Sequence, residues 1–174
     1  GSWAAVVANG YLSGTGVASL YVLNIQTGAV IREIIVPDMD QNGLSSPTVI
    51  DYDGDGFADN AYAGDLNGNL WRFDVNAGTV AFGGNPLFQT AVSGGVRQAI
   101  TTAPEVGVHP EGGVMVYVGT GRLLAVADSM DESTQAVYGI WDDDSGPADF
   151  AKLVVQQLKS VAHASGEFVR TATA

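Results

Sequence analysis

Residues 60–75, with the sequence NAYAGDLNGNLWRFDV, contain two short hydrophobic segments separated by a glycine-containing polar loop. In the second segment, residues 70–75, large and polar side chains alternate, which is typical of a β-strand because successive side chains point to opposite faces. The first segment, residues 60–64, ends in Gly64, directly before the loop. The stretch therefore predicts two paired strands joined by a turn.

The same arrangement occurs three times along the chain. First strands are expected at residues 6–10, 60–64 and 115–119, and second strands at 20–25, 70–75 and 137–142. One position of each second strand is aromatic and the position two residues later is also large, the pairs being Tyr21 and Leu23, Trp71 and Phe73, Tyr138 and Ile140. A spacing of two places both members of each pair on one face of its sheet.

Turns and opening strands follow the same repeat. Gly28 and Gly78 come after the second strands of the first two units, where a tight turn requires a positive φ. Residues 47–50 and 104–108 each begin with proline and predict a strand that opens the second and third units. Units of about four strands and roughly 50 to 60 residues are typical of β-propeller blades, which bury their faces against neighbouring blades.

We therefore expect an all-β chain that forms one partial propeller domain of about three blades over residues 1–174. The blade-like units are expected at about residues 3–36, 44–92 and 98–145, followed by a tail at 146–174. In the tail, Asp149 could cap a short helix, or residues 153–157 could form a strand. Residues 166–174 read as an unfinished strand.

The composition excludes several classes of function. Seven Lys and Arg residues against nineteen Asp and Glu residues give a net charge of −12, which repels phosphate backbones and anionic lipids, so no nucleic-acid partner is expected. The acidity either aids solubility or favours cations. The absence of cysteine excludes a disulfide framework, a zinc–thiolate site and a cysteine nucleophile. No apolar run approaches the ~20 residues of a transmembrane helix, so no transmembrane segment is expected.

One motif carries metal chemistry. Residues 51–59 read DYDGDGFAD, with carboxylates at loop positions 1, 3, 5 and 9 and glycine at position 6, from Asp51, Asp53, Asp55, Asp59 and Gly56. This is the spacing of the first nine positions of an EF-hand loop, in which alternate residues aim oxygen atoms at Ca²⁺. The carbonyl of Phe57 falls at position 7, where such loops use a backbone ligand.

The loop is nevertheless not an EF-hand. Position 12, which holds a bidentate Glu in EF-hands, is Tyr62, and strands rather than helices are expected on both sides. Asp59 must therefore act as a direct ligand, with water completing the shell. The alternative without a metal is an Asp-Gly-rich turn whose side chains cap its own backbone. Four carboxylates in register with the glycine favour Ca²⁺ over that turn, and over Mg²⁺, which keeps more water ligands.

No catalytic group accompanies the loop, and we expect no enzymatic activity. His109 is expected in a turn and His163 in the tail, and neither has a visible Ser or Asp partner. The loop at residues 120–136 contains Asp128, Asp131 and Glu132, which could form a second cation site or a solvated tip; the irregular spacing favours the tip. The tryptophans, Trp3, Trp71 and Trp141, are expected to pack within or between blades, with sugar stacking as the alternative.

Residues 44–75, together with residues 118–122 and 138–142, resemble the C-terminal propeller of PilY-type type IV pilus proteins. The resemblance covers most of the chain in the same order. It implies a modified seven-bladed propeller with an EF-hand-like calcium loop, whose ligands would be Asp51, Asp53, Asp55, the Phe57 carbonyl and Asp59. The length departs from the family pattern, because only about three blades are present.

The resemblance further implies an exported protein at the cell surface, the pilus tip or the outer membrane. Its expected role is calcium-dependent pilus extension, twitching motility and adhesion, with pilins or minor pilins and host-surface ligands as partners. Two other classes also resemble parts of the chain. The loop and the strand before it are similar to calcium-binding blades of integrin-type adhesion propellers. The Thr-Gly turns are similar to quinoprotein dehydrogenase propellers, although the absence of cysteine argues against that enzyme class.

Overall fold

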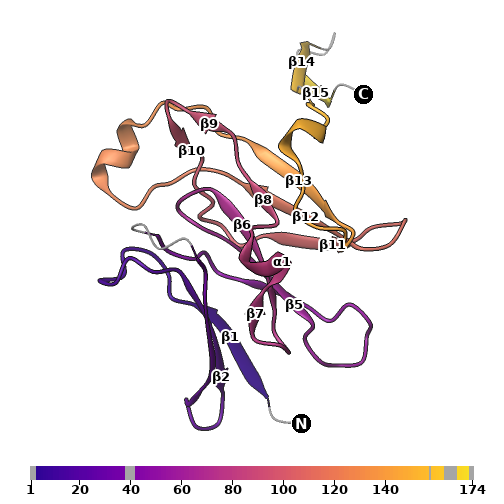
Figure 1. Ribbon diagram of the computed structural model, residues 1–174. Coiled ribbons are helices and arrows are strands. Elements are labelled where there is room, and N and C mark those ends of the chain that lie inside the picture. The colour runs from indigo at the N-terminus through magenta and orange to yellow at the C-terminus, as the bar shows by residue number, and fades with distance from the viewer. Residues whose placement is uncertain (1–2, 38–41, 157, 163–167, 173–174) are drawn as a thin grey trace.

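The computed structural model describes residues 3–37, 42–156, 158–162 and 168–172. Strands dominate these ranges and form three larger antiparallel sheets (Figure 1). The first sheet contains β1 (Ala4–Ala8), β2 (Ser19–Asn24) and β3 (Val30–Ile35). The second contains β4 (Thr48–Ile50), β5 (Asn60–Gly64), β6 (Asn69–Asp74), β7 (Thr79–Val80) and β8 (Phe88–Gln89). The third contains β11 (Glu105–Val108), β12 (Val114–Gly119) and β13 (Val137–Asp142).

Two short hairpins and three helical turns complete the described elements. The hairpins are β9 (Val92–Ser93) with β10 (Val96–Arg97), and β14 (Leu158–Ala162) with β15 (Phe168–Ala172). The helical turns are α1 (Ala81–Gly84) and the 3₁₀ turns η1 (Val126–Met130) and η2 (Phe150–Lys152). No helix in the described ranges is long and apolar enough to cross a bilayer.

The strands predicted for the three units are present, and their bounds differ from the expected ones by no more than two residues. β4 and β11 are the two strands that open their units, directly after Pro47 and Pro104. The turn glycines Gly28 and Gly78 have φ values of 71° and 73°, as a tight turn requires. The three sheets fall inside the three expected blade-like ranges, whereas the hairpin of β9 and β10 begins at the last residue of the second range and ends just before the third. The blade boundaries themselves stay a prediction.

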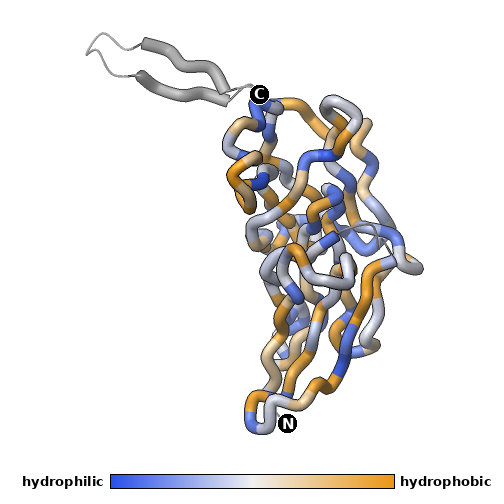
Figure 2. The backbone as a smooth tube through the Cα atoms, turned by 90° about the vertical axis from the view of Figure 1, so that its left-hand side faces the viewer, coloured by the Kyte–Doolittle hydropathy of each residue, from blue (hydrophilic) through white to orange (hydrophobic). Residues whose placement is uncertain are grey.

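The second sheet is buried on both faces because a neighbouring sheet packs on each. One core cluster joins it to the first sheet and includes Leu20 and Ile34 together with Trp71 and Phe73. The other joins it to the third sheet through Tyr62, Leu70, Ile100, Val116, Tyr138 and Ile140. The sheets follow one another in chain order along an elongated body, with β1 near one end and β13 toward the other (Figures 1 and 2).

The shared face of the second strands is confirmed, and it explains why the first unit is less buried. Trp71 and Phe73 face the first sheet, and Tyr138 and Ile140 face the second. Tyr21 is the corresponding residue of β2, and no sheet among the described residues packs on its face. Its hydroxyl donates instead to the exposed Glu33 carboxylate at 2.7 Å. The second strands of the second and third units therefore present their large residues to the preceding sheet.

The tail contains a short helical turn, as one alternative predicted, and a strand that begins later than the other alternative predicted. Asp149 caps the 3₁₀ turn η2, and its carboxylate accepts from the Ala151 amide at 2.9 Å. Residues 153–156 form no strand, so the strand expected at 153–157 is wrong over that range; residue 157 lies outside the described residues. The following strand is β14, from Leu158. The strand expected within 166–174 is present as β15, Phe168–Ala172.

Candidate metal centre

The aspartate loop, residues 51–59, connects β4 to β5 and is anchored at its base by the sheet. The last pair of these antiparallel strands is Ile50 with Asn60. The Asp59 amide then donates to the Ile50 carbonyl at 2.9 Å, and the Asp59 carbonyl accepts from the Val75 amide at 3.0 Å. The first and last residues of the loop are thus held close together by backbone hydrogen bonds.

Backbone amides hold the carboxylates of the loop in place. The two oxygens of Asp51 accept from the amides of Gly54 and Gly56, each at 2.8 Å. The Asp59 carboxylate accepts from the Tyr52 amide at 2.7 Å, across the mouth of the loop. Gly54 and Gly56 have φ values of 76° and 88°, in the left-handed region that favours glycine. The two glycines therefore let the chain curl around the carboxylates.

Three of the four predicted carboxylates come together. One oxygen each from Asp51, Asp53 and Asp59 can be chosen so that all lie within 4.8 Å of one another. Ca²⁺ binds oxygens at about 2.3 to 2.6 Å, so ligands on opposite sides of one ion are about 5 Å apart. A single ion could thus contact all three oxygens. Asp51 and Asp53 are exposed, and Asp59 is half-buried.

Asp55 and Phe57 are placed differently from the other predicted ligands. The Asp55 carboxylate is not part of the three-residue group, and it accepts from the Phe57 amide at 2.8 Å. The Phe57 side chain is exposed, and its carbonyl as a ligand stays a prediction. At position 12, Tyr62 is fully buried and donates its hydroxyl to Asp142 at 2.8 Å. Tyr62 therefore belongs to the core, and its hydroxyl is engaged by Asp142.

The donor chemistry of the loop fits a hard cation. All three clustered side chains offer carboxylate oxygens, which Ca²⁺ prefers, and no nitrogen or sulfur ligand lies in their group. Each carboxylate oxygen that accepts one amide keeps a second lone pair for a metal. If an ion binds, Asp51, Asp53 and Asp59 are the residues that would hold it. A cation there would offset the repulsion between neighbouring carboxylates.

A second acidic centre, which sequence reasoning missed, is the fully buried Asp65 in the turn between β5 and β6. Its carboxylate accepts from the side chains of Asn42, Asn69 and Trp71 at 2.7 to 2.8 Å, and from the Asn69 amide at 2.8 Å. Burial raises the pKa of Asp65, and these donors oppose the rise. The only hint in the sequence is an aspartate at the start of a glycine turn.

A third acidic residue, Asp142 at the end of β13, joins the second and third sheets. Its buried carboxylate pairs with the Arg72 guanidinium, with an N–O distance of 3.1 Å, and Arg72 also contacts Asp144 at 2.7 Å. The Arg72 Nε donates to the side chain of Asn60 at 3.1 Å. Sequence reasoning did not find this pair, because the two residues lie 70 positions apart.

The remaining sequence candidates have structural roles. Asp128 accepts from the Leu124 and Ala125 amides and pairs with Arg122 at 2.9 Å, which supports the solvated-tip reading of the loop at 120–136. His109 stacks on Trp141 with a ring distance of 4.4 Å, and His163 lies outside the described residues. Trp71 packs in the core, whereas Trp3 is 82% exposed, so Trp3 does not pack within the described part of this chain and its packing against a further blade stays a prediction.

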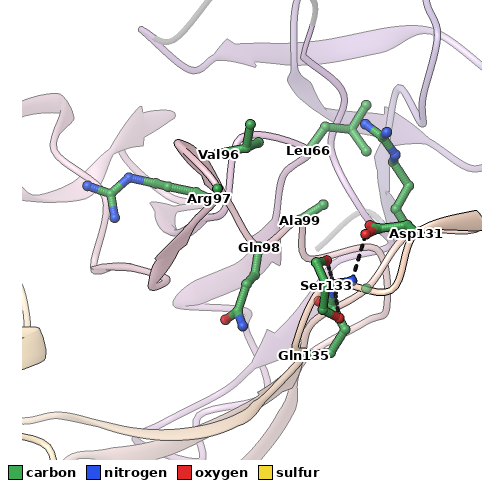
Figure 3. Close-up of a pocket in the computed structure, with 11 residues that line it drawn as sticks. Leu66, Val96, Arg97, Gln98, Ala99, Asp131, Ser133 and Gln135 are labelled. Atoms are coloured by element: carbon green, nitrogen blue, oxygen red, sulfur yellow. Dashed lines mark hydrogen bonds between the residues drawn. The ribbon is translucent and has the colours of Figure 1, made fainter.

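A hollow of about 360 Å³, lined by Leu66 among others, lies near the opposite end of β5 from the aspartate loop. Figure 3 shows the side chains that line it. Asp131 accepts from the Ser133 amide at 2.9 Å, and Gln135 donates to the Ser133 hydroxyl at 2.8 Å (Figure 3). The Arg97 side chain points away from the hollow and donates to the Thr90 carbonyl (Figure 3). These polar groups therefore bond to the protein itself.

Comparisons with known proteins agree on one family. The family model described as the PilY1 β-propeller domain matches residues 1–81 and 77–161. The chain is 41% identical over 171 residues to a type IV pilus biogenesis factor PilY1 from Pseudomonas aeruginosa, a match that covers 83% of the chain. It is 38% identical over 195 residues to a PilY1 homologue from Xylella fastidiosa, covering 99% of the chain.

A solved structure gives the same result. The crystal structure of the Pseudomonas aeruginosa PilY1 C-terminal domain matches with a TM-score of 0.84 and 36% identity, over 100% of this chain and 44% of that one. The matches span only 15% and 13% of the Pseudomonas and Xylella proteins. The all-β fold of a partial propeller, as predicted from the repeats, is confirmed.

Proposed function

Because the chain belongs to the PilY1 β-propeller family, we propose that it forms the calcium-binding part of a type IV pilus biogenesis factor. The observation that carries the proposal is the loop at residues 51–59, where Asp51, Asp53 and Asp59 bring oxygens within 4.8 Å of one another. The net charge of −12 gives the protein a field that attracts cations. The relatives are named as biogenesis factors, which supports a binding role rather than catalysis.

In the proposed role, calcium orders the loop and so supports pilus extension, twitching motility and surface adhesion. The partners would be pilins or minor pilins, with host-surface molecules as further ligands, and the place of action would be the cell surface or the pilus tip. The support is that the relatives are named as type IV pilus biogenesis factors. The exposed position of the loop also supports the proposal, because an ion bound there could order the loop without disturbing the buried core.

Calcium binding is tested by isothermal titration calorimetry of the purified chain. We expect a dissociation constant of roughly 10⁻⁶ to 10⁻⁴ M, since several carboxylates favour the ion whereas the missing position 12 Glu removes two oxygens. Asp59→Ala should weaken binding at least tenfold, because it removes one of the three clustered carboxylates. Asp55→Asn should change affinity little, since Asp55 lies outside the cluster and the amide keeps an oxygen.

Glu132→Ala is the matched control, because it removes an exposed carboxylate far from the aspartate loop along the chain. It should bind calcium as the wild type does. Equal binding by wild type and Asp59→Ala would exclude the loop as the calcium site.

The pilus role is tested with the same loop in the full-length protein. Cells carrying Asp51→Ala should lose calcium-dependent surface pili and twitching, whereas cells carrying Asp55→Asn should keep them. Pilus number and twitching are measured at matched protein levels, at low and at high calcium. Wild-type behaviour of Asp51→Ala cells at every calcium level would contradict a calcium-dependent role in pilus function.

A further inference from the structure

Tyr52 links the aspartate loop to the third sheet. It lies between Asp51 and Asp53, and its amide donates to the Asp59 carboxylate at 2.7 Å. Its ring is half exposed, and its hydroxyl accepts from the Gly113 amide at 3.1 Å. One residue therefore contacts a clustered carboxylate through its backbone and a neighbouring sheet through its side chain.

Gly113 belongs to the turn between β11 and β12, residues 109–113, which contacts the end of β13. The His109 amide donates to the Gly113 carbonyl at 3.1 Å, and the Trp141 indole nitrogen donates to the Gly112 carbonyl at 2.9 Å. Gly113 has a φ of 75°, and a Cβ there would lie 3.0 Å from Asp143 Cα. The His109 ring stacks on Trp141. A movement of Gly113 would thus displace the residues that it contacts at the end of β13.

The same end of β13 holds the ion pair between the second and third sheets. Asp142 pairs with Arg72, and Arg72 donates to Asn60, the residue directly after Asp59. A hollow of about 250 Å³ lies among these groups and is lined by Tyr52, Arg72, Gly113 and Asp142. The start and the end of the aspartate loop therefore both face the contact between the two sheets.

We propose that Tyr52 is a coupling residue that transmits calcium occupancy of the loop to the 109–113 turn and to the contact between the second and third sheets. This proposal rests on the proposed calcium binding. An ion shared by Asp51, Asp53 and Asp59 fixes the backbone of Tyr52, which lies between two of these residues and bonds to the third. The fixed backbone holds the hydroxyl against the Gly113 amide.

Without the ion, repulsion between the carboxylates loosens the loop, and the bond to Gly113 opens more often. Coupling of this kind is reciprocal, so the contact with Gly113 also strengthens calcium binding. Removing the hydroxyl should therefore lower the calcium affinity about two- to tenfold, the effect of a single neutral hydrogen bond.

The test is backbone amide hydrogen exchange, followed by NMR on the full 174-residue chain with and without calcium, alongside calorimetry. In the wild type, calcium should slow exchange at Gly113. In Tyr52→Phe, which keeps the ring and removes the hydroxyl, calcium should still bind with the expected two- to tenfold loss, and exchange at Gly113 should no longer respond. Tyr117→Phe, a hydroxyl removal on the outer face of β12, is the control and should behave as the wild type.

The outcomes separate the two proposals. If the wild type binds no calcium, both are overturned. If it binds calcium and Gly113 exchange is unchanged, or if Gly113 responds equally in Tyr52→Phe, calcium binding stands and the coupling role of Tyr52 is wrong.

Discussion

Asp59 and Asp65 are both acidic residues at a strand end, but their surroundings give them different capacities. The Asp59 carboxylate is half-buried, accepts a hydrogen bond from the Tyr52 amide and lies beside two other carboxylates. The Asp65 carboxylate is fully buried, and three side-chain donors share its Oδ2. Lone pairs that already accept protein donors cannot bind a metal. Residue type alone thus does not distinguish a ligand from a structural carboxylate.

Asp65→Asn should lower the free energy of unfolding by about 1 to 3 kcal/mol at neutral pH. The substitution replaces a carboxylate oxygen, which accepts hydrogen bonds from the protein, with an NH₂ group that faces those same donors. Asp143→Asn, an exposed change of the same kind, should have little effect. Urea denaturation measures both.

The pH dependence of the wild type and Asp65→Asn should also differ. Burial raises the pKa of Asp65 in the folded state above its unfolded value, so the folded protein binds this proton more tightly. The associated stability is fully present below the unfolded pKa and is lost as the pH rises through the folded pKa. The stability difference between wild type and Asp65→Asn should therefore be larger in acid than at neutral pH; parallel pH curves would contradict this.

At the scale of elements, the end of β5 packs closely against Ile100, a residue of the segment before β11. Gly64 ends β5, and a Cβ at this position would overlap the side chain of Ile100, which is fully buried. The Ile100 amide donates to the Asp65 carbonyl at 2.9 Å, so the backbone holds Ile100 at this spot. The glycine that ends the first strand of the second unit is therefore required by packing, and its φ lies outside the left-handed region.

Gly64→Ala should lower the free energy of unfolding by about 1 to 3 kcal/mol, the usual cost of overpacking a core. Gly107→Ala in β11 is the matched control, because nothing lies within 4 Å of a Cβ there. Its effect should stay within about 0.5 kcal/mol. Chemical denaturation of the two variants measures the difference. Equal stabilities would contradict the conclusion that packing against Ile100 requires a glycine at position 64.

For the whole molecule, the outer faces of the first and third sheets have no partner sheet among the described residues. On the third sheet, Tyr117, Val137 and Trp141 are 46%, 81% and 39% exposed, and on the first, Val7 and Ile35 are 38% and 50% exposed. The chain spans 44% of the matched crystal structure. In a propeller, neighbouring blades cover such faces.

The isolated chain should therefore self-associate, because apolar sheet faces exposed to water favour contact with another copy. Sedimentation velocity should show an apparent mass that rises with concentration. Val137→Lys should reduce the association, whereas Glu132→Lys, which also places a lysine on the surface but outside the strand, should not. A stable monomer at all concentrations would contradict this expectation.

The sequence by itself determined the strands, the repeat and the loop, because these depend on local rules. Alternating side chains, turn glycines and a fixed ligand spacing act over a few residues, so Trp71 and Phe73 could be placed on one face and Asp51, Asp53 and Asp59 in one loop. Asp55 has the predicted spacing, but it lies outside the group of three clustered carboxylates, and its carboxylate accepts from the Phe57 amide; its role as a ligand stays a prediction.

Tertiary structure alone decided which polar groups meet between sheets. Arg72 and Asp142, Tyr52 and Gly113, and Asp65 and Asn42 are pairs from distant parts of the chain or from different turns. Their contacts depend on how the sheets stack, and that stacking follows from burial of apolar faces. Because burial is non-directional, the apolar pattern in the sequence does not specify which polar groups meet. The residues that join the aspartate loop to the rest of the protein could therefore be identified only once the three sheets were packed together.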